Sequence, residues 1–222
     1  MQKFDSPAPV AAVIEIPAGR VQVIAADRTD TTVDVRPADP GRSRDVKAAA
    51  QATVDYRDGV LRVAAPEAKN QYFGPSGSIE VTVQLPAGSR IEVKAAAADL
   101  RGVGRLGDVA YEGSAGAIKI DEAASARLTT AAGDVSIGRL GGPAEISTQK
   151  GDIRITEAVR GALVLTTQLG EVSVGAAPGI SASLDAGTGY GRIHNALRNA
   201  GGAADLTIHA TTAHGDITAR SI

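Results

Sequence analysis

Acidic side chains recur at one point of a repeated sequence pattern and raise the question of a metal site. The acids are Asp99, Asp134, Asp152, Glu171 and Asp216. Asp134, Asp152 and Glu171 fall in consecutive repeats, so stacked repeats would place neighbouring carboxylates about 5 Å apart. Because calcium prefers oxygen clusters of this kind, these three residues are the metal candidates. The alternative is that they accept hydrogen bonds from backbone groups in turns.

The turn interpretation is favoured over metal binding. The calcium-binding nonapeptide repeat is absent, the spacing does not fit it, and Arg192 interrupts the acidic row. Repulsion between neighbouring carboxylates on a solvated corner is only about 1 kcal/mol per pair in water. We therefore expect no bound metal and no cofactor.

Threonine hydroxyls also align in the repeats. Thr130, Thr148, Thr167 and Thr212 each lie three residues before a glycine. A threonine nucleophile needs an adjacent base, and the repeat places no His or Lys beside this row. We expect these hydroxyls to hydrogen-bond backbone groups.

Two further patterns have structural interpretations. His194, His209 and His214 are the only histidines, and their spacing brings together no partners for metal or base chemistry. The segment 102–107 matches G-x-G-x-x-G, but another repeat strand follows it instead of the helix that a dinucleotide site needs. We therefore expect no catalytic residue and no cofactor-binding residue.

The composition excludes several other classes. The chain has 222 residues, no Cys, 3% aromatic residues and a formal net charge of -2. Disulfides, thiolate zinc sites and a cysteine nucleophile are thereby excluded. The charge and the scarcity of rings argue against nucleic-acid binding. No apolar run approaches the roughly 20 residues of a membrane-spanning helix.

The elements that must position these side chains are short strands. Each repeat is a strand, a tight turn at a glycine, and a second strand that alternates apolar and polar residues. The intervals between the glycines are 17, 18, 19, 21 and 24 residues. The turn glycines are Gly116, Gly133, Gly151, Gly170, Gly191 and Gly215. A corner with positive φ explains them, since glycine adopts positive φ at least cost.

This pattern predicts an all-β fold. An N-terminal antiparallel β region, residues 1–94, would cap and continue into a β-solenoid of about six coils, residues 95–222. Val135, Ile153, Val172 and Ile193 would form one inward stripe of the solenoid.

Local signals in the N-terminal region and the repeats predict turns and short helices. Asp58-Gly59 predicts a tight hairpin, and residues 13–23 read as a second hairpin-like pair. Residues 44–51 and 121–127 are the segments that could hold a helical turn or two.

The repeated Thr-x-x-Gly-Asp-Val/Ile-x-Ile units, preceded by Leu85-Pro86-Ala87-Gly88-Ser89, resemble a bacterial family of β-strand-repeat proteins of unknown function labelled "putative adhesin". The resemblance runs from Phe4 to Ile217. It implies a β-solenoid-like, non-enzymatic domain, which in some members is attached to the cell envelope. It carries over no catalytic residues.

The functional hypothesis is a non-catalytic scaffold or interaction domain, adhesin-like, with a protein partner. Outward residues of the second strands are small or singly charged, which favours a protein over a sugar: Lys119, Ser136, Arg154, Ser173, His194 and Thr218. The alternatives are a cytoplasmic regulatory module that binds a partner and, less favoured, a β-helix enzyme acting on polysaccharides.

Two expectations concern location and assembly. The N-terminal residues lack the apolar segment of a signal peptide, so we expect a cytoplasmic protein, or an envelope-associated one if a leader was removed. An uncapped last coil, ending at Ile222, predicts an end-to-end homodimer.

Overall fold

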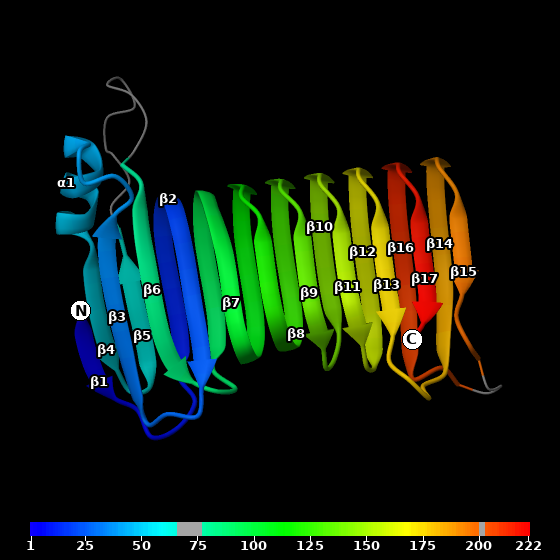
Figure 1. Ribbon diagram of the computed structural model, residues 1–222, viewed down its shortest axis with the longest axis horizontal. Helices are drawn as coiled ribbons and strands as arrows, with labels where there is room; N and C mark the ends of the chain where they lie inside the picture. The colour runs from blue at the N-terminus through cyan, green and yellow to red at the C-terminus, as the bar shows by residue number, and fades with distance from the viewer. Residues whose placement is uncertain (66–76, 200–202) are drawn as a thin grey trace. The chain divides into compact units, whose positions relative to one another are not determined.

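The computed structural model describes residues 1–65, 77–199 and 203–222. Its contacts divide the chain into two units, Met1–Gly116 and Ala117–Ile222. Figure 1 labels the strands and the helix of the chain. Both units are built from strands that stack coil upon coil, so the predicted all-β solenoid is confirmed. The division into a capping region 1–94 and a solenoid 95–222 stays a prediction. Among the described residues, no helix is both long and apolar enough to cross a membrane.

The first unit is organised around its second strand, which pairs with other strands on both of its sides. The elements are β1 (Gln2–Asp5), β2 (Ala11–Ala26), β3 (Asp30–Pro37), α1 (Ser43–Gln51), β4 (Thr53–Arg57), β5 (Val60–Ala64), β6 (Ile79–Pro86) and β7 (Arg90–Ala115). The first half of β2 pairs in parallel with β5 and β7, and its second half pairs in parallel with β6 and β7. The coil formed by β2 therefore lies between the coil of β5 and β6 and the coil of β7.

The hairpin predicted over residues 13–23 is wrong, because β2 turns a corner instead of reversing. At the corner, Gly19 has a φ of 132°, and a Cβ there would overlap the carbonyl oxygen of Ile79. Since each half of the strand has partners on its own face, the chain bends without pairing with itself.

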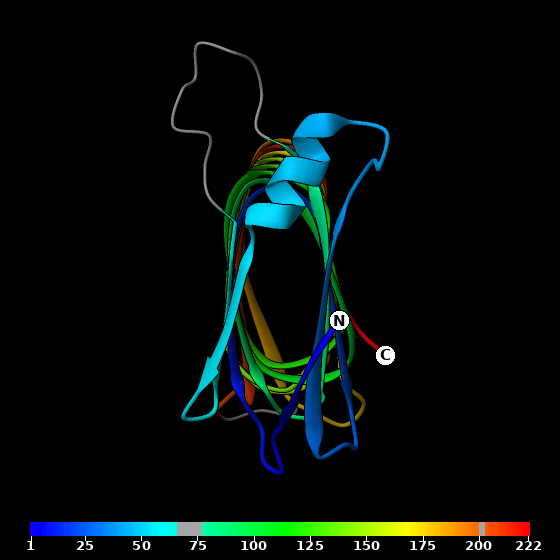
Figure 2. The ribbon, with the colours of Figure 1, turned by 90° about the vertical axis from the view of Figure 1, so that its left-hand side faces the viewer.

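The antiparallel pairing predicted for this region occurs in the outer strands. β1 with β3, β3 with β6, and β4 with β5 are antiparallel. The hairpin at Asp58-Gly59 is confirmed, with φ values of 51° and 75°. The helix predicted at 44–51 is also confirmed as α1, which connects β3 to β4 at the upper end of the unit in Figure 2.

Aromatic rings close the outer end of the first unit. Phe4 of β1 and Tyr56 of β4 stack with their ring centroids 5.1 Å apart. Beneath them, inward side chains such as Val33 and Leu61 are fully buried. Each buried side chain of this size stabilises the fold by about 1.5–3 kcal/mol, so the pair covers a real end of the core.

The second unit has two faces of parallel strands. Its elements are β8 (Ile118–Ala132), β9 (Val135–Leu140), β10 (Ala144–Lys150), β11 (Ile153–Ala158), β12 (Gly161–Leu169), β13 (Val172–Ala176), β14 (Ala182–Tyr190), β15 (Ile193–Ala196), β16 (Leu206–His214) and β17 (Ile217–Ser221). The β10 face contains the second half of β8, then β10, β12, β16 and β14. The β11 face contains the first half of β8, then β9, β11, β13, β17 and β15.

The helix predicted over residues 121–127 is wrong, since these residues belong to β8. Ala123 pairs with Leu140 and Ala126 with Ala144, on neighbouring coils. Alanine favours a helix in isolation, but the strand ladders with β9 and β10 override that propensity.

The order of the last two coils differs from the order in the chain. β16 and β17 lie between the coil of β12 and β13 and the coil of β14 and β15, as Figure 1 shows. The predicted inward stripe is therefore wrong at its end: Ile217 follows Val172, and Ile193 follows Ile217. The more apolar coil takes the inner place, because Asn195 of β15 occupies the position that Ala219 holds in β17.

Corner glycines set how closely the coils approach. A Cβ on Gly151, Gly170 or Gly215 would overlap the carbonyl oxygen of the glycine in the coil before it. These residues have φ values of 146°, 157° and 150°. Other side chains are excluded here both by space and by backbone conformation.

We expect Gly170→Ala to destabilise the protein by about 3 kcal/mol or more, because the added methyl must push two coils apart. Chemical denaturation measures the change. Gly187→Ala is the control, since no atom lies within 4 Å of a Cβ at that position. Equal effects of the two substitutions would contradict the proposed close approach at the corner.

An acidic group in the first unit gives the fold a pH dependence. Arg28 Nε lies 2.8 Å and Lys3 Nζ 3.0 Å from the Asp30 carboxylate. These hydrogen bonds lower the pKa of Asp30 from 3.8 to about 2. The folded state therefore holds the charged form more strongly than the unfolded state does.

The stabilising effect of the charged Asp30 carboxylate is present above about pH 4 and is lost as the pH falls through 2. Unfolding measured from pH 5 to pH 2 should show a smaller loss of stability in Asp30→Asn than in the wild type. A variant that loses stability as steeply as the wild type over this range would refute the role of Asp30.

Candidate functional site

The repeated acids lie directly after the corner glycines of the second unit. The Asp152 backbone N–H donates to Asp134 Oδ1 at 2.9 Å, and the Glu171 N–H donates to Asp152 Oδ1 at 2.8 Å. At the far end of the row, the Arg192 N–H donates to Asp216 Oδ1 at 2.8 Å. Each of these carboxylates therefore connects its own coil to the next one.

These hydrogen bonds define what the acidic row can do. Among the described residues, no group of three or more His, Cys, Asp or Glu side chains is placed to hold a metal ion. The Arg192 backbone N–H, opposed by some burial and aided by the Arg192 charge, lowers the pKa of Asp216. Asp216 thus favours its charged form mainly through a backbone donor, as charge-assisted hydrogen bonds usually do.

Arg192 does not lie beside Glu171, as the order of the repeats in the sequence would place it. It neighbours Asp216 and not Glu171, because the coil of β16 and β17 lies between. Arg192 Nη2 also lies 3.2 Å from Asp216 Oδ2. Asp99 belongs to the first unit, where it is exposed and pairs in register with Arg20.

The threonine row points inward at the same corner. Thr167 Oγ1 donates to the carbonyl of Gly151, and Thr212 Oγ1 donates to that of Gly170, both at 3.0 Å. Thr188 of β14, which the sequence pattern did not single out, donates in the same way to Gly215. Thr148 Oγ1 is buried without a partner among the described residues.

The histidines lie apart on the surface. His209 Nδ1 is 3.2 Å from Asp185 Oδ2 on the β10 face, and His194 is exposed on β15. His214 stacks on Tyr190, with ring centroids 5.0 Å apart. Tyr190 is 75% exposed, and only the pairing of β14 with β16 brings it to His214.

The G-x-G-x-x-G segment at 102–107 lies within β7, which continues to Ala115. A Cβ on Gly104 would overlap the carbonyl oxygen of Ala25, and Gly107 packs against Gly88. The glycines therefore serve close packing between coils. No helix N-terminus follows them, so the phosphate-binding geometry of a dinucleotide site is missing here.

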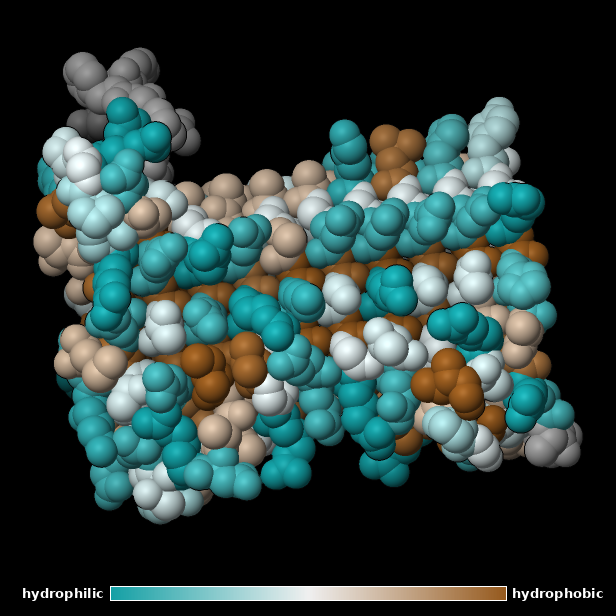
Figure 3. Space-filling model, viewed as in Figure 1, coloured by the Kyte–Doolittle hydropathy of each residue, from teal (hydrophilic) through white to brown (hydrophobic). Residues whose placement is uncertain are grey.

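The outward residues expected on the second strands form one row across the β11 face. Their order in space is Lys119, Ser136, Arg154, Ser173, Thr218 and His194. Lys119, Arg154 and His194 are exposed and the other three are half-buried. In Figure 3 this face shows hydrophilic side chains in rows that follow the stacking direction of the strands.

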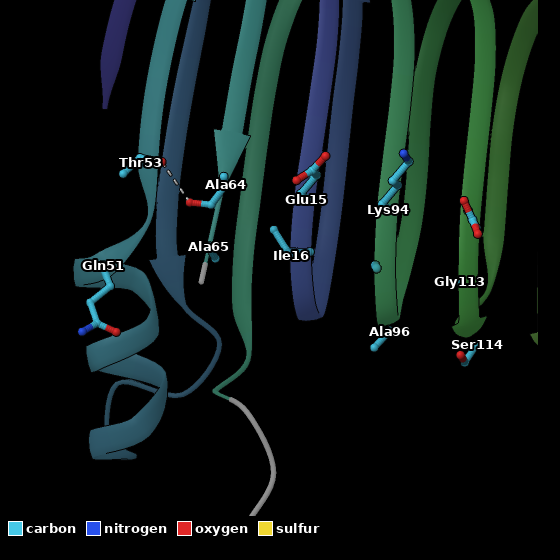
Figure 4. A pocket seen from close by; sticks show the side chains of 12 residues that line it. Glu15, Ile16, Gln51, Thr53, Ala64, Ala65, Lys94, Ala96, Gly113 and Ser114 are labelled. Carbon is cyan, nitrogen blue, oxygen red and sulfur yellow. Dashed lines mark hydrogen bonds between the residues drawn. The ribbon is translucent and has the colours of Figure 1, made fainter. Parts of the chain in front are cut away.

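Sequence reasoning missed a cavity of about 810 Å³ in the first unit. Small side chains, including Ala64, Ala65 and Ala95, line it, together with Gln51 and Thr53 at the end of α1 and the start of β4. Figure 4 shows Thr53, whose hydroxyl donates to the Ala64 carbonyl at 3.3 Å. No local motif could have predicted this cavity, because its lining residues come from five separate segments.

Charged groups stand at the cavity wall. Glu15 of β2 and Lys94 of β7 are register partners, and both are exposed (Figure 4). Lys94 Nζ lies 3.6 Å from Glu92 Oε1, and Glu112 adds a further carboxylate to the lining. A surface with this composition can hold a polar or cationic group against an alanine-lined wall.

Comparisons with known proteins agree with this architecture. The model of the Toastrack DUF4097 family matches residues 13–221. The chain therefore belongs to the Toastrack DUF4097 family, and the resemblance inferred from its repeated motifs is confirmed. Comparison with curated proteins gives no match.

Solved structures also resemble this chain. A "putative adhesin" from Bacteroides fragilis NCTC 9343 matches with a TM-score of 0.58 and 13% identity, over 98% of this chain and 95% of that chain. A "putative lipid binding protein" from Parabacteroides distasonis ATCC 8503 matches with a TM-score of 0.41 and 10% identity, over 98% and 95%. The first of these similarities shows a shared fold.

The threonine row provides a matched pair of substitutions. We expect Thr167→Val to lower the free energy of unfolding by about 1 kcal/mol, because a buried hydrogen bond to Gly151 is lost. Thr148→Val removes a buried hydroxyl that has no partner among the described residues, so stability should stay equal or rise. Urea unfolding of both variants tests this, and a larger loss for Thr148→Val than for Thr167→Val would contradict it.

Proposed function

We propose that this chain is a non-catalytic scaffold that binds a protein partner through the β11 face of its second unit. The observation that carries this proposal is a pair of free cations on a regular surface. Lys119 and Arg154 are exposed, and neither makes an ion pair or a side-chain hydrogen bond with the described part of the chain. On the β10 face, by contrast, Arg127 Nε lies 3.3 Å from the Glu145 carboxylate.

The geometry of the row fits an extended polypeptide surface. Parallel strands repeat about every 4.8 Å, so Lys119 and Arg154, on alternate strands, stand about 10 Å apart with Ser136 between them. Short side chains leave the face flat. Such a face complements carboxylates on a partner, and charge pairs of this kind determine partner choice and association rate.

The repeated polar groups support a structural role over a catalytic one. Thr167 and Thr212 donate to backbone carbonyls, and Asp134 and Asp152 accept backbone N–H groups. Groups engaged in this way hold coils together. The solved structure named a "putative adhesin", which shares this fold, is in keeping with a binding function.

A capture experiment tests the proposal. Immobilised protein is incubated with an extract of the source bacterium, and bound proteins are quantified by mass spectrometry. Charge reversal in the double variant Lys119→Glu/Arg154→Glu should reduce recovery of a specific partner about tenfold, since two favourable charge contacts become repulsive.

The double variant Arg127→Glu/Lys150→Glu is the matched control, because it makes the same charge change on exposed residues of the β10 face. It should retain the partner. Equal recovery by all three proteins, or the absence of any specific partner, would refute binding through this face.

A further inference from the structure

The outermost coil of the second unit is made by β14 and β15. Among the described strands, β14 pairs only with β16 and β15 only with β17. The Ala182 N–H at the start of β14 donates to the Arg198 carbonyl at 3.1 Å. Beyond it, the other edges of β14 and β15 carry backbone N–H and C=O groups with no neighbouring strand among the described residues. This open coil is residues 182–196. The sequence predicted that the coil ending at Ile222 would be the exposed one, but that coil is covered by β14 and β15.

The core is open at the same place. Ile193 is 46% exposed, whereas Ile217 at the equivalent position of the next coil is 1% exposed. Leu184 and Ala186 of β14 are only half-buried. The end of the first unit differs, because there Phe4 and Tyr56 stack, and Tyr56 pairs in register with the buried Leu61.

The open edge also lacks the usual protection against pairing. Exposed edge strands commonly carry charges or proline. The outer strands of the first unit follow this rule, with Lys3 and Asp5 on β1 and Asp55 and Arg57 on β4. β14 and β15 contain one charged residue between them, Asp185, and no proline.

The shape of this end specifies its occupant. It presents a nine-residue strand and a four-residue strand on opposite faces of a half-covered apolar core. A single extended peptide could pair with only one of them. A matching surface must offer two strands and apolar side chains between them, which is what an identical coil end offers.

We propose that two copies of this chain associate end to end through β14 and β15. A two-fold axis reverses one copy, so β14 of each copy pairs antiparallel with β14 of the other, centred near Ala186. This choice matches the two longest edges and covers Leu184 and Ile193. Because the contact is isologous, it closes at a dimer and does not continue into a fibre.

Sedimentation equilibrium over a concentration series tests the assembly. The wild type should shift from monomer to dimer as concentration rises. Ile193→Lys should remain monomeric where the wild type is dimeric, because a charge then enters the apolar contact. Val164→Lys is the control: Val164 is 45% exposed, against 46% for Ile193, but it faces outward from β12. It should dimerise as the wild type does.

Circular dichroism and thermal unfolding check that each variant is folded. A wild type that stays monomeric at every concentration would overturn the proposal. So would equal dimerisation of the Ile193 and Val164 variants, or growth into larger assemblies.

A cysteine pair locates the contact, since the chain contains no Cys. Gly187→Cys on β14 should give a covalent dimer with a bis-maleimide. Thr166→Cys lies in the same outward row two strands away and should not. Failure of Gly187→Cys to cross-link under dimerising conditions would overturn the β14 pairing.

Discussion

Close approach of backbone at the glycine corner is the constraint on which the stack depends. The ladder of backbone hydrogen bonds continues through the turn, where the Gly151 N–H donates to Leu169 O and the Gly170 N–H donates to His214 O, at 2.9 and 3.0 Å. Threonine closes the corner from inside, and the carboxylate closes it from outside. Because all three residue types share one turn, Thr, Gly and Asp recur together at the spacing that first suggested chemistry.

The same constraint explains how much the sequence could reveal. The glycine period and the alternation of apolar residues are local, so the strands, the corners and the roles of the threonines follow from them. The order of the coils is not local. The repeated motif would allow either the Gly191 corner or the Gly215 corner to stack next to Gly170. Which coil takes the inner position depends on whether Asn195 or Ala219 enters the core.

The candidate surfaces also differ in whether local sequence patterns could predict them. The outward row of the β11 face could be written down from strand alternation, although its order changes at Thr218 and His194. The cavity beside Glu15 and Lys94 could not be predicted in this way, because it forms only where β2, β5, β7 and α1 come together.

The aromatic residues have two different roles. Phe4 and Tyr56 stack at a coil end, while Tyr111 is buried and donates to Ala98 O at 2.7 Å. Burial, with the nearby Asp99 charge, raises the pKa of Tyr111, as expected for a phenol that serves packing.

The exchanged order of the last two coils governs how this unit can be assembled during synthesis. Residues 182–196 leave the ribosome before residues 206–221, yet they are separated from β12 and β13 by the later segment. The coil of β14 and β15 therefore has no native neighbouring coil until β16 and β17 have emerged as well. Growth of the stack cannot simply follow translation from one coil to the next, as it can in a repeat protein with consecutive order. Residues 206–221 complete the unit by inserting between two coils that precede them in the chain.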